Sequence, residues 1–184
     1  MKTAVLLSGG LDSAVCLAIW QHADDLVAVT VDYGQPSQGE KRAAQRLCAH
    51  YNVQQVRVGV SNAFEPGVGL FGNDLSNAPS TVVPHRNLVL LSLAAAATGA
   101  QRIVIGCNAD DLADYVDCRP AFLRQVEAAL GGVMVVAPLI DQTKREVVKT
   151  AKALSVPIED TVSCYLGTGC GECSACKLRI EALS

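Results

Sequence analysis

Residues 8–13 read SGGLDS and follow directly on the apolar run 3–7. A short buried strand that passes through a glycine turn into a helix presents free backbone N–H groups and the positive end of the helix dipole. Such a turn binds phosphate or pyrophosphate, because the glycines allow the backbone to approach the anion closely. Asp12 either caps the helix or holds a Mg²⁺ that bridges phosphates. The candidate nucleotide-binding residues are Leu7, Ser8, Gly9, Gly10, Leu11, Asp12 and Ser13.

A second group of chemistry-bearing residues is a cysteine cluster in the segment 164–176, which is rich in glycine. Four thiolates at this spacing close a tetrahedral sphere around Zn²⁺ and leave no open position, so the site is expected to be structural. The flanking Lys177 and Arg179 are expected to offset its negative charge. An iron–sulfur cluster and redox-active thiols are the alternatives, although the C-x3-C-P element of ferredoxins is missing. The expected metal ligands are Cys164, Cys170, Cys173 and Cys176.

The composition limits the classes of protein to consider. A chain of 184 residues, half of them apolar, forms one domain with a small appendage. Its net charge of −3 and its aromatic content of 4% argue against a wide nucleic-acid footprint. Residues 3–7 are too short for a secretory signal, and residues 88–97 are too short to span a bilayer. We therefore expect a cytoplasmic protein with reduced thiols and no membrane partner.

Apolar strand-like runs alternate with helix-like runs along the chain. The runs lack polar alternation, which is typical of strands that are covered on both faces. The pattern predicts an α/β fold, an open parallel sheet with helices on both faces. Ligands then bind beyond the carboxyl ends of the strands, where the motifs lie. Strands are predicted at 3–7, 26–32, 53–59, 102–106 and 133–136, and helices at 12–22, 38–51, 86–98, 119–130 and 143–153.

The longest predicted loop, residues 60–84, is rich in Gly, Pro, Asn and Ser. Loops of this length are functional lids or are disordered. Residues 67–72 match the pattern G-x-G-x-x-G, but no apolar helix follows them. Because that motif requires a strand before it and a helix after it, we reject it as a dinucleotide site.

Several motifs in order make the chain resemble the 7-cyano-7-deazaguanine synthase family of PP-loop (N-type) ATP pyrophosphatases. The glycine turn and the cysteine cluster match the family's PP-loop and zinc segment, and the likeness extends over nearly the whole chain. The other matching segments are 32–35 (DYGQ), 83–87 (VPHRN), 117–119 (DCR), 138–144 (PLIDQTK) and 163–165 (SCY).

The resemblance implies a nucleotide-binding α/β domain over residues 1–159, of the adenine nucleotide alpha hydrolase-like type, and a zinc-binding segment over residues 160–184. It implies that ATP activates 7-carboxy-7-deazaguanine as an acyl adenylate and that ammonia then displaces AMP to give an amide. Adenylation of the amide oxygen then lets a nitrile form. ATP, Mg²⁺ and Zn²⁺ are the expected cofactors, a homodimer is the expected assembly, and no direct nucleic-acid partner is expected.

The resemblance also suggests roles for individual residues. Departing pyrophosphate must be neutralised, which makes Lys144 and Arg86 the candidate catalytic cations beside Asp12. A solvated Lys144 and a purely structural Arg86–Asp117 pair are the plain alternatives. Asp32 and Tyr33 are further expected nucleotide-binding residues. The expected substrate-binding residues are Gln35, Arg86, Asn87, Asp117 and Arg119, with Asp117 on the ring N–H groups.

The departures from the family pattern cluster around the expected substrate wall. Pro36 and Ser37 replace the usual Arg-His, His85 replaces a glycine, and residues 112–116 differ. The segment at 128–133 is also short. These changes leave open an enzyme that stops at the amide or transfers the acyl group to another amine. The nucleotide turn would also suit a tRNA thiolase or a non-enzymatic nucleotide sensor.

Overall fold

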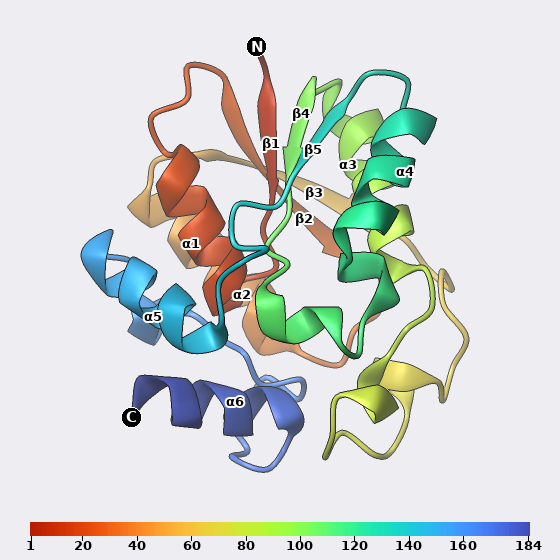
Figure 1. Ribbon diagram of the computed structural model, residues 1–184, viewed down its shortest axis with the longest axis vertical. Coiled ribbons are helices and arrows are strands. Elements are labelled where there is room, and N and C mark those ends of the chain that lie inside the picture. Colours follow the sequence, from red (N-terminus) through yellow and green to blue (C-terminus); the bar gives the residue numbers. More distant parts are fainter.

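The computed structural model describes residues 1–184. Its centre is one sheet of five parallel strands in the order β3-β2-β1-β4-β5. All five strands point toward the end of the molecule where the C-terminal segment lies, which is the lower end in Figure 1. The strands are β1 (Thr3–Leu6), β2 (Leu26–Asp32), β3 (Gln54–Gly59), β4 (Arg102–Val104) and β5 (Met134–Val136).

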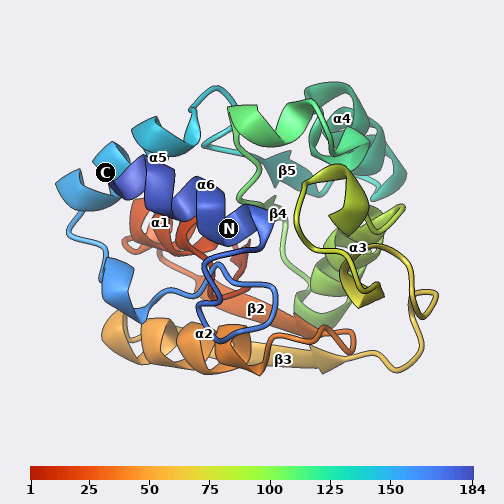
Figure 2. The ribbon, with the colours of Figure 1, turned by 90° about the horizontal axis from the view of Figure 1, so that it is seen from below.

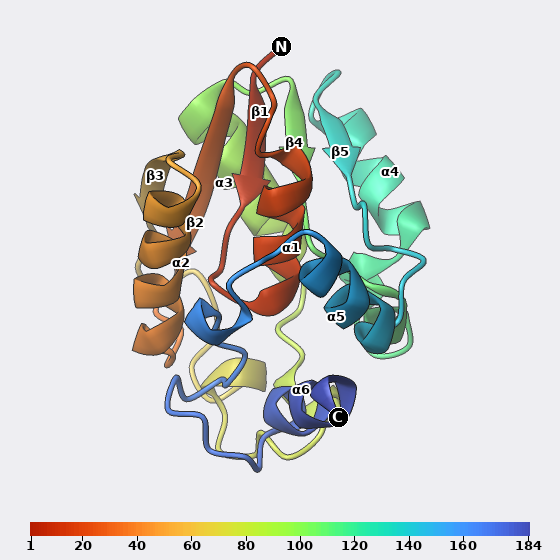
Figure 3. The same ribbon diagram turned by 90° about the vertical axis from the view of Figure 1, so that its left-hand side faces the viewer.

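Helices cover both faces of the sheet, as Figures 2 and 3 show. Helices α1, α2 and α5 pack on one face around Leu11, Leu47 and Val147, and α3 and α4 pack on the other around Leu91 and Leu123. Each face thus buries its own apolar cluster, and the fully buried strand β1 lies between the two. The helices are α1 (Leu11–Trp20), α2 (Gln38–His50), α3 (Arg86–Thr98), α4 (Pro120–Ala129), α5 (Lys144–Ala153) and α6 (Ser174–Leu183).

The structure confirms the predicted fold class, with the predicted element boundaries shifted by no more than a few residues. Helix α6 was not predicted; it follows the cysteine segment and lies beneath the carboxyl ends of the strands (Figure 1). None of the helices is both long enough and apolar enough to cross a membrane. The division at residue 159 stays a prediction.

The long loop 60–84 is built of tight turns. It contains two short 3-10 helices, at Gly69–Phe71 and Pro79–Thr81. Gly69 has φ +58° and packs so tightly that a Cβ would lie 2.1 Å from the carbonyl oxygen of Val82. The glycines of the G-x-G-x-x-G match therefore serve loop packing, and no strand–turn–helix corner forms there.

The chain reverses its direction of travel across the sheet beside β1. It proceeds from β1 to β2 and β3 on one side, and then returns to place β4 and β5 on the other. Ligand crevices open at such switch points. Gly106, just after β4, lets the start of α1 approach, because a Cβ there would lie 3.1 Å from the Ser13 nitrogen. The switch point therefore brings the glycine turn next to the residues that follow β4.

Candidate functional site

The glycine turn leaves the start of α1 free for an anion. Gly9 takes φ +96°, which L residues rarely adopt, and the helix begins at Leu11 without a side-chain cap. The backbone N–H groups of Leu11, Asp12 and Ser13 donate no hydrogen bond. Uncapped N–H groups at a helix start bind anions. The predicted phosphate-binding geometry is therefore present, whereas the predicted alternative of Asp12 as a helix cap is not formed.

Hydroxyl groups stiffen this turn. The Ser8 hydroxyl accepts a hydrogen bond from the Gly10 N–H (3.1 Å) and lies 3.1 Å from the Ser13 hydroxyl, which in turn donates to the Gly10 carbonyl (2.9 Å). The N–H of Val162 donates to the Gly9 carbonyl at 2.9 Å. The turn is thus held from the C-terminal part of the chain as well as from within.

A cavity of about 500 Å³ opens in front of the turn, at the switch point between β1 and β4. This volume lies within the usual range for small-molecule sites. Of the predicted site residues, Gly9, Asp32, Asp117 and Arg119 do not line it. The predicted residues that line it are Leu7, Ser8, Gly10, Leu11, Asp12, Ser13, Tyr33, Gln35, Arg86, Asn87 and Lys144.

Lys144 reaches the nucleotide turn from the start of α5. Its ammonium nitrogen lies 2.5 Å from Asp12 Oδ2, and its backbone N–H donates to Asp110 Oδ2 at 2.8 Å. Thr143 and Glu146 cap this helix reciprocally, which fixes its first residue. Lys144 is buried, so the solvated alternative does not apply. Asp12 Oδ1 is buried without a partner, which leaves it available to a cation.

Arg86 supplies the second positive charge of the cavity. No carboxylate lies within 4.0 Å of its guanidinium group, so the structural pair with Asp117 does not form. Burial lowers the pKa of Arg86, but the neighbouring Tyr33 and Asp117 raise it more, and the group stays charged. Arg86 is partly buried, and a cation shielded from water without a counter-ion is costly unless an anion completes the site. The geometry therefore favours an anionic ligand at Arg86.

Four of the predicted site residues make hydrogen bonds or an ion pair within the protein. Asp117 Oδ2 accepts the backbone N–H of Asn87 (2.9 Å) and so caps α3 from a distant segment. Arg119 donates to the carbonyls of Leu112 and Ala113, and Gln35 bonds the backbone of Val31 and Tyr33. Asp32 pairs with Lys41 outside the cavity. These contacts make them positioning residues in this structure, and direct ligand contacts by Asp117 and Arg119 stay predictions.

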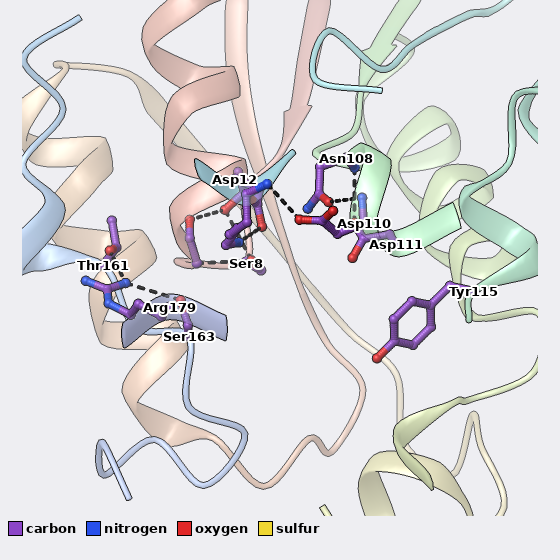
Figure 4. Close-up of polar contacts among 12 residues, drawn as sticks. Ser8, Asp12, Asn108, Asp110, Asp111, Tyr115, Thr161, Ser163 and Arg179 are labelled. Carbon is purple, nitrogen blue, oxygen red and sulfur yellow. Dashed lines mark hydrogen bonds and ion pairs between the residues drawn. The ribbon is translucent and has the colours of Figure 1, made fainter. Parts of the chain in front are cut away.

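The cavity also contains acidic and phenolic residues that the sequence did not single out. Burial, and next the charge of Asp12, raise the pKa of Asp111 to about 6. Figure 4 shows Asp110 and Asp111 across from Asp12 and Ser8, with Tyr115 on the same side as the two aspartates. The one sequence signal for Asp110, Asp111 and Tyr115 is that they lie shortly before the DCR motif. The additional polar lining residues are Glu40, Asp110, Asp111, Asp114, Tyr115, Ser163 and Tyr165.

Hydroxyl groups from three segments meet at the cavity wall. Tyr115 lies 2.8 Å from the Thr81 hydroxyl of the long loop and 3.4 Å from the Tyr165 hydroxyl, beside the cysteine cluster. The N–H of Ser174 donates to the carbonyl of Leu75 at 2.9 Å. The long loop is therefore attached both to Tyr115 and to the C-terminal segment, and together they close one side of the cavity.

Arg179 connects helix α6 to the nucleotide turn. Its guanidinium group donates to the hydroxyls of Thr161 (2.7 Å) and Ser163 (3.2 Å) and to the carbonyl of Ile158 (2.7 Å), as Figure 4 shows in part. The segment it holds is the one whose Val162 N–H bonds Gly9. The direct hydrogen bonds of Arg179 go to these oxygen atoms, and its predicted role in offsetting the charge of the cysteines stays a prediction.

The four cysteines of the C-terminal segment converge on one point. Their Sγ atoms all lie within 4.8 Å of one another, with 3.6 Å between Cys164 and Cys170 and 4.0 Å between Cys170 and Cys176. A tetrahedral ion with bonds of about 2.3 Å to sulfur separates its ligands by about 3.8 Å. The residues therefore fit a single metal ion, whereas a cluster of several iron atoms needs sulfurs farther apart.

Comparisons with known proteins show the family to which the chain belongs. A family model described as "Queuosine biosynthesis protein QueC" matches residues 2–184. A 7-cyano-7-deazaguanine synthase of Oceanobacillus iheyensis is 35% identical, with 98% of this chain and 92% of the relative covered. Proteins of the same name from Synechococcus sp. and Azoarcus sp. are 39% and 38% identical, with 92% of each relative covered.

Solved structures support the fold. The NMN synthetase of Francisella tularensis superposes with a TM-score of 0.58 at 21% identity, covering 91% of this chain and 68% of that chain. The NH3-dependent NAD synthetase of Campylobacter jejuni gives a TM-score of 0.54 at 16% identity, with the same coverages. At these identities the likeness concerns the fold alone, and it is the parallel-sheet fold described above.

Proposed function

The chain belongs to the QueC family, and from that premise we propose that it is an ATP-dependent 7-cyano-7-deazaguanine synthase. Its reaction joins 7-carboxy-7-deazaguanine to ammonia and carries the product through the amide to the nitrile. One observation carries the proposal beyond the resemblance: a single cavity holds an uncapped helix start and, apart from it, the partly buried Arg86 without an ion-pair partner. These are the two anion sites that a nucleotide and a carboxylate substrate require.

The first step is adenylation of the substrate carboxylate. The N–H groups at the start of α1 bind the phosphates of ATP, and Arg86 holds the carboxylate so that its oxygen faces the α-phosphorus. Lys144 balances the charge that develops on the pyrophosphate as it leaves. A Mg²⁺ ion fits at Asp12, whose Oδ1 is buried without a partner, and there it would neutralise phosphate charge. The products are an acyl adenylate and pyrophosphate.

The later steps take place at the same acyl carbon. Ammonia displaces AMP to give the amide, and a second ATP adenylates the amide oxygen so that AMP leaves again as the nitrile forms. The amide therefore has to remain bound while the nucleotide is exchanged. Asn87, Gln35, Asp117 and Arg119 keep the wall near Arg86 in place, and we propose that Asn87 also contacts the deazaguanine ring.

We propose zinc as the ion of the four-cysteine cluster, in a structural role. The sulfur geometry suits one tetrahedral ion with all positions filled, so this ion takes no part in the chemistry. When bound, it supplies cross-links that a short glycine-rich segment lacks. The proposal also includes a cytoplasmic homodimer, for which the edge strand β5 with its exposed Met134 offers an apolar surface. Light scattering of the purified protein tests the dimer.

Product analysis tests the proposed reaction. Purified protein is incubated with ATP, Mg²⁺, ammonium and 7-carboxy-7-deazaguanine, and the products are identified by mass spectrometry. We expect the nitrile together with two AMP and two pyrophosphate per turnover. AMP with only the amide or a conjugate would contradict the synthase assignment but retain the adenylation. Absence of AMP with any 7-substituted deazaguanine would contradict both.

A further inference from the structure

The carboxyl group of Glu40 lines the cavity without a bonding partner. Glu40 lies in the first turn of α2, and its side chain takes part in no hydrogen bond and no ion pair. None of the steps described above uses it. A carboxyl group in an enzyme cavity that makes no internal contact is available to a ligand or to a proton.

The local sequence would normally make Glu40 part of a helix cap. Ser37-x-x-Glu40 has the spacing of a capping box, in which the glutamate accepts the backbone N–H of the capping residue. At the start of α5, Thr143 and Glu146 make both halves of this exchange, with 2.8 Å between Glu146 Oε2 and the Thr143 N–H. At α2 only the Ser37 half is present, at 3.3 Å from the Glu40 N–H. The Glu40 carboxyl is therefore turned away from the cap and toward the cavity.

Its position is next to the reacting groups. A Cβ on Gly9 would lie 2.2 Å from the Glu40 carbonyl, so the first turn of α2 packs directly on the phosphate-binding turn. Arg86 from α3 and Cys164 of the cysteine segment act electrostatically on Glu40, and Glu40 acts in the same way on Tyr33 after β2. Glu40 therefore lies near the phosphate-binding turn and within electrostatic reach of the guanidinium group at which we place the substrate carboxylate.

The environment also keeps the proton affinity of this group high. Burial raises the pKa of Glu40 to about 8, with Arg86 lowering it and Cys164 raising it. A base with a pKa near the working pH both exists in its deprotonated form and holds the proton it receives. An exposed glutamate would be a much weaker base.

The reaction needs such a group, because all three protons of ammonia leave the same nitrogen. When ammonia attacks the acyl adenylate, a C–N bond forms, the C–O bond to AMP breaks, and nitrogen gives up one proton. Adenylation of the amide oxygen requires the loss of a second. When AMP leaves again, a further C–N bond forms and nitrogen loses its last proton as the nitrile appears.

We propose that Glu40 is a catalytic general base that accepts protons from the substrate nitrogen in these steps. The proposal rests on the proposed function. It requires the carboxylate oxygen of Glu40 to approach the nitrogen on the side of the acyl carbon near Arg86. After each transfer the proton passes from the partly exposed Glu40 to water.

The test separates adenylation of the substrate carboxylate, which removes no proton from nitrogen, from amide formation, which does. Exchange of labelled pyrophosphate into ATP is measured with 7-carboxy-7-deazaguanine and without ammonium, and amide formation is then measured in a single turnover. For Glu40→Gln we expect exchange within about threefold of wild type and amide formation slower by about 10²–10³-fold. Glu40→Asp should fall in between, and Glu159→Gln, at an exposed site, should match wild type.

A second nucleophile sharpens the result. Hydroxylamine is a much weaker base than ammonia, so after attack its nitrogen loses a proton to water more readily. The defect of Glu40→Gln should therefore shrink when hydroxylamine replaces ammonia. Three results would each overturn the role of Glu40. They are an equal loss of exchange and amide formation in both Glu40 variants, normal amide formation in Glu40→Gln, and an equal defect with both nucleophiles. Absence of exchange in the wild-type protein would instead overturn the proposed function itself, and the Glu40 role with it.

Discussion

Lys144 and Asp12 form an ion pair at 2.5 Å although they lie 132 positions apart in the chain. The pair joins the start of α5 to the start of α1 and places a cation at the phosphate-binding turn. Because the lysine is buried, its charge is little screened by water. The contact thus unites two motifs that the sequence shows only separately.

Removing this cation tests its role in pyrophosphate departure. For Lys144→Met we expect kcat to fall by about 10²–10³-fold, as for the loss of one electrostatic contact to a transition state. Lys149→Met, on the exposed side of the same helix, is the matched control and should retain full activity. Steady-state release of pyrophosphate measures both. A Lys144→Met enzyme with wild-type kcat would show that the ion pair is only structural.

The two glycines of the turn should respond differently to a methyl group. A Cβ on Gly10 meets only the Ser8 hydroxyl (3.3 Å) and Val162 carbonyl, so Gly10→Ala should fold normally but bind ATP about tenfold more weakly. Gly9→Ala should instead lower the melting temperature, since its Cβ collides with Glu40 and φ is positive. Gly59→Ala, with open space around it, is the control. Calorimetric titration with ATP that showed unchanged affinity in Gly10→Ala would refute the phosphate assignment.

The cysteine cluster should bind one equivalent of zinc and stabilise the fold. Cys173→Ala leaves three ligands, so we expect loss of the metal together with a lower melting temperature. Cys48→Ala removes a thiol from the main core and should keep the zinc. Elemental analysis of protein never exposed to chelator checks this prediction. Less than about half an equivalent in the wild-type protein would count against a zinc site.

The hydroxyl of Tyr115 should matter for substrate binding more than for ATP. Tyr115→Phe removes its contacts with Thr81 and Tyr165, at a net cost of about 1 kcal/mol each, so the KM for the deazaguanine should rise about threefold to tenfold. Hydrogen exchange in residues 75–84 should become faster. Tyr51→Phe, which removes a buried hydroxyl without a partner, serves as control. Equal rises in both KM values would argue against a local effect.

The stability of the protein should depend on the ionisation of Glu40. Its pKa of about 8 in the fold exceeds the ordinary value of 4.5, because burial disfavours the charge. The folded state therefore binds more protons between these values, and the free energy of unfolding falls as pH rises through this window. Glu40→Gln removes this contribution, so its advantage over wild type should grow from pH 5 to pH 8. We expect a melting temperature about 3 °C higher at pH 8.

Thermal melts of both proteins across this pH range, at equal zinc content, make the comparison. Asp111, whose pKa is also raised by burial, is present in both proteins and cancels in the difference. A constant difference between the two melting temperatures would mean that Glu40 titrates normally in the fold.

The sequence by itself determined the fold class, the nucleotide turn and the cysteine cluster. These features are local: the SGGLDS turn and the four cysteines each lie within one short segment, and the apolar period marks each strand. Helix α6 was missed because its apolar pattern is weak and it follows a glycine-rich segment. The local structure of a short motif depends little on the distant residues that pack against it in the fold. Such features can therefore be inferred from the sequence alone.

Only the tertiary structure decided which side chains share the cavity. Asp117 accepts the backbone N–H of Asn87, and Arg119 donates to the carbonyls of Leu112 and Ala113. The expected contacts of Asp117 and Arg119 with the substrate stay predictions. Ser37-x-x-Glu40 has the spacing of a capping box, but the Glu40 side chain makes no cap contact and Glu40 lines the cavity. Whether a carboxylate caps a helix or lines a cavity depends on a few ångströms of packing between distant segments. That packing is set by the order β3-β2-β1-β4-β5, which no local pattern encodes.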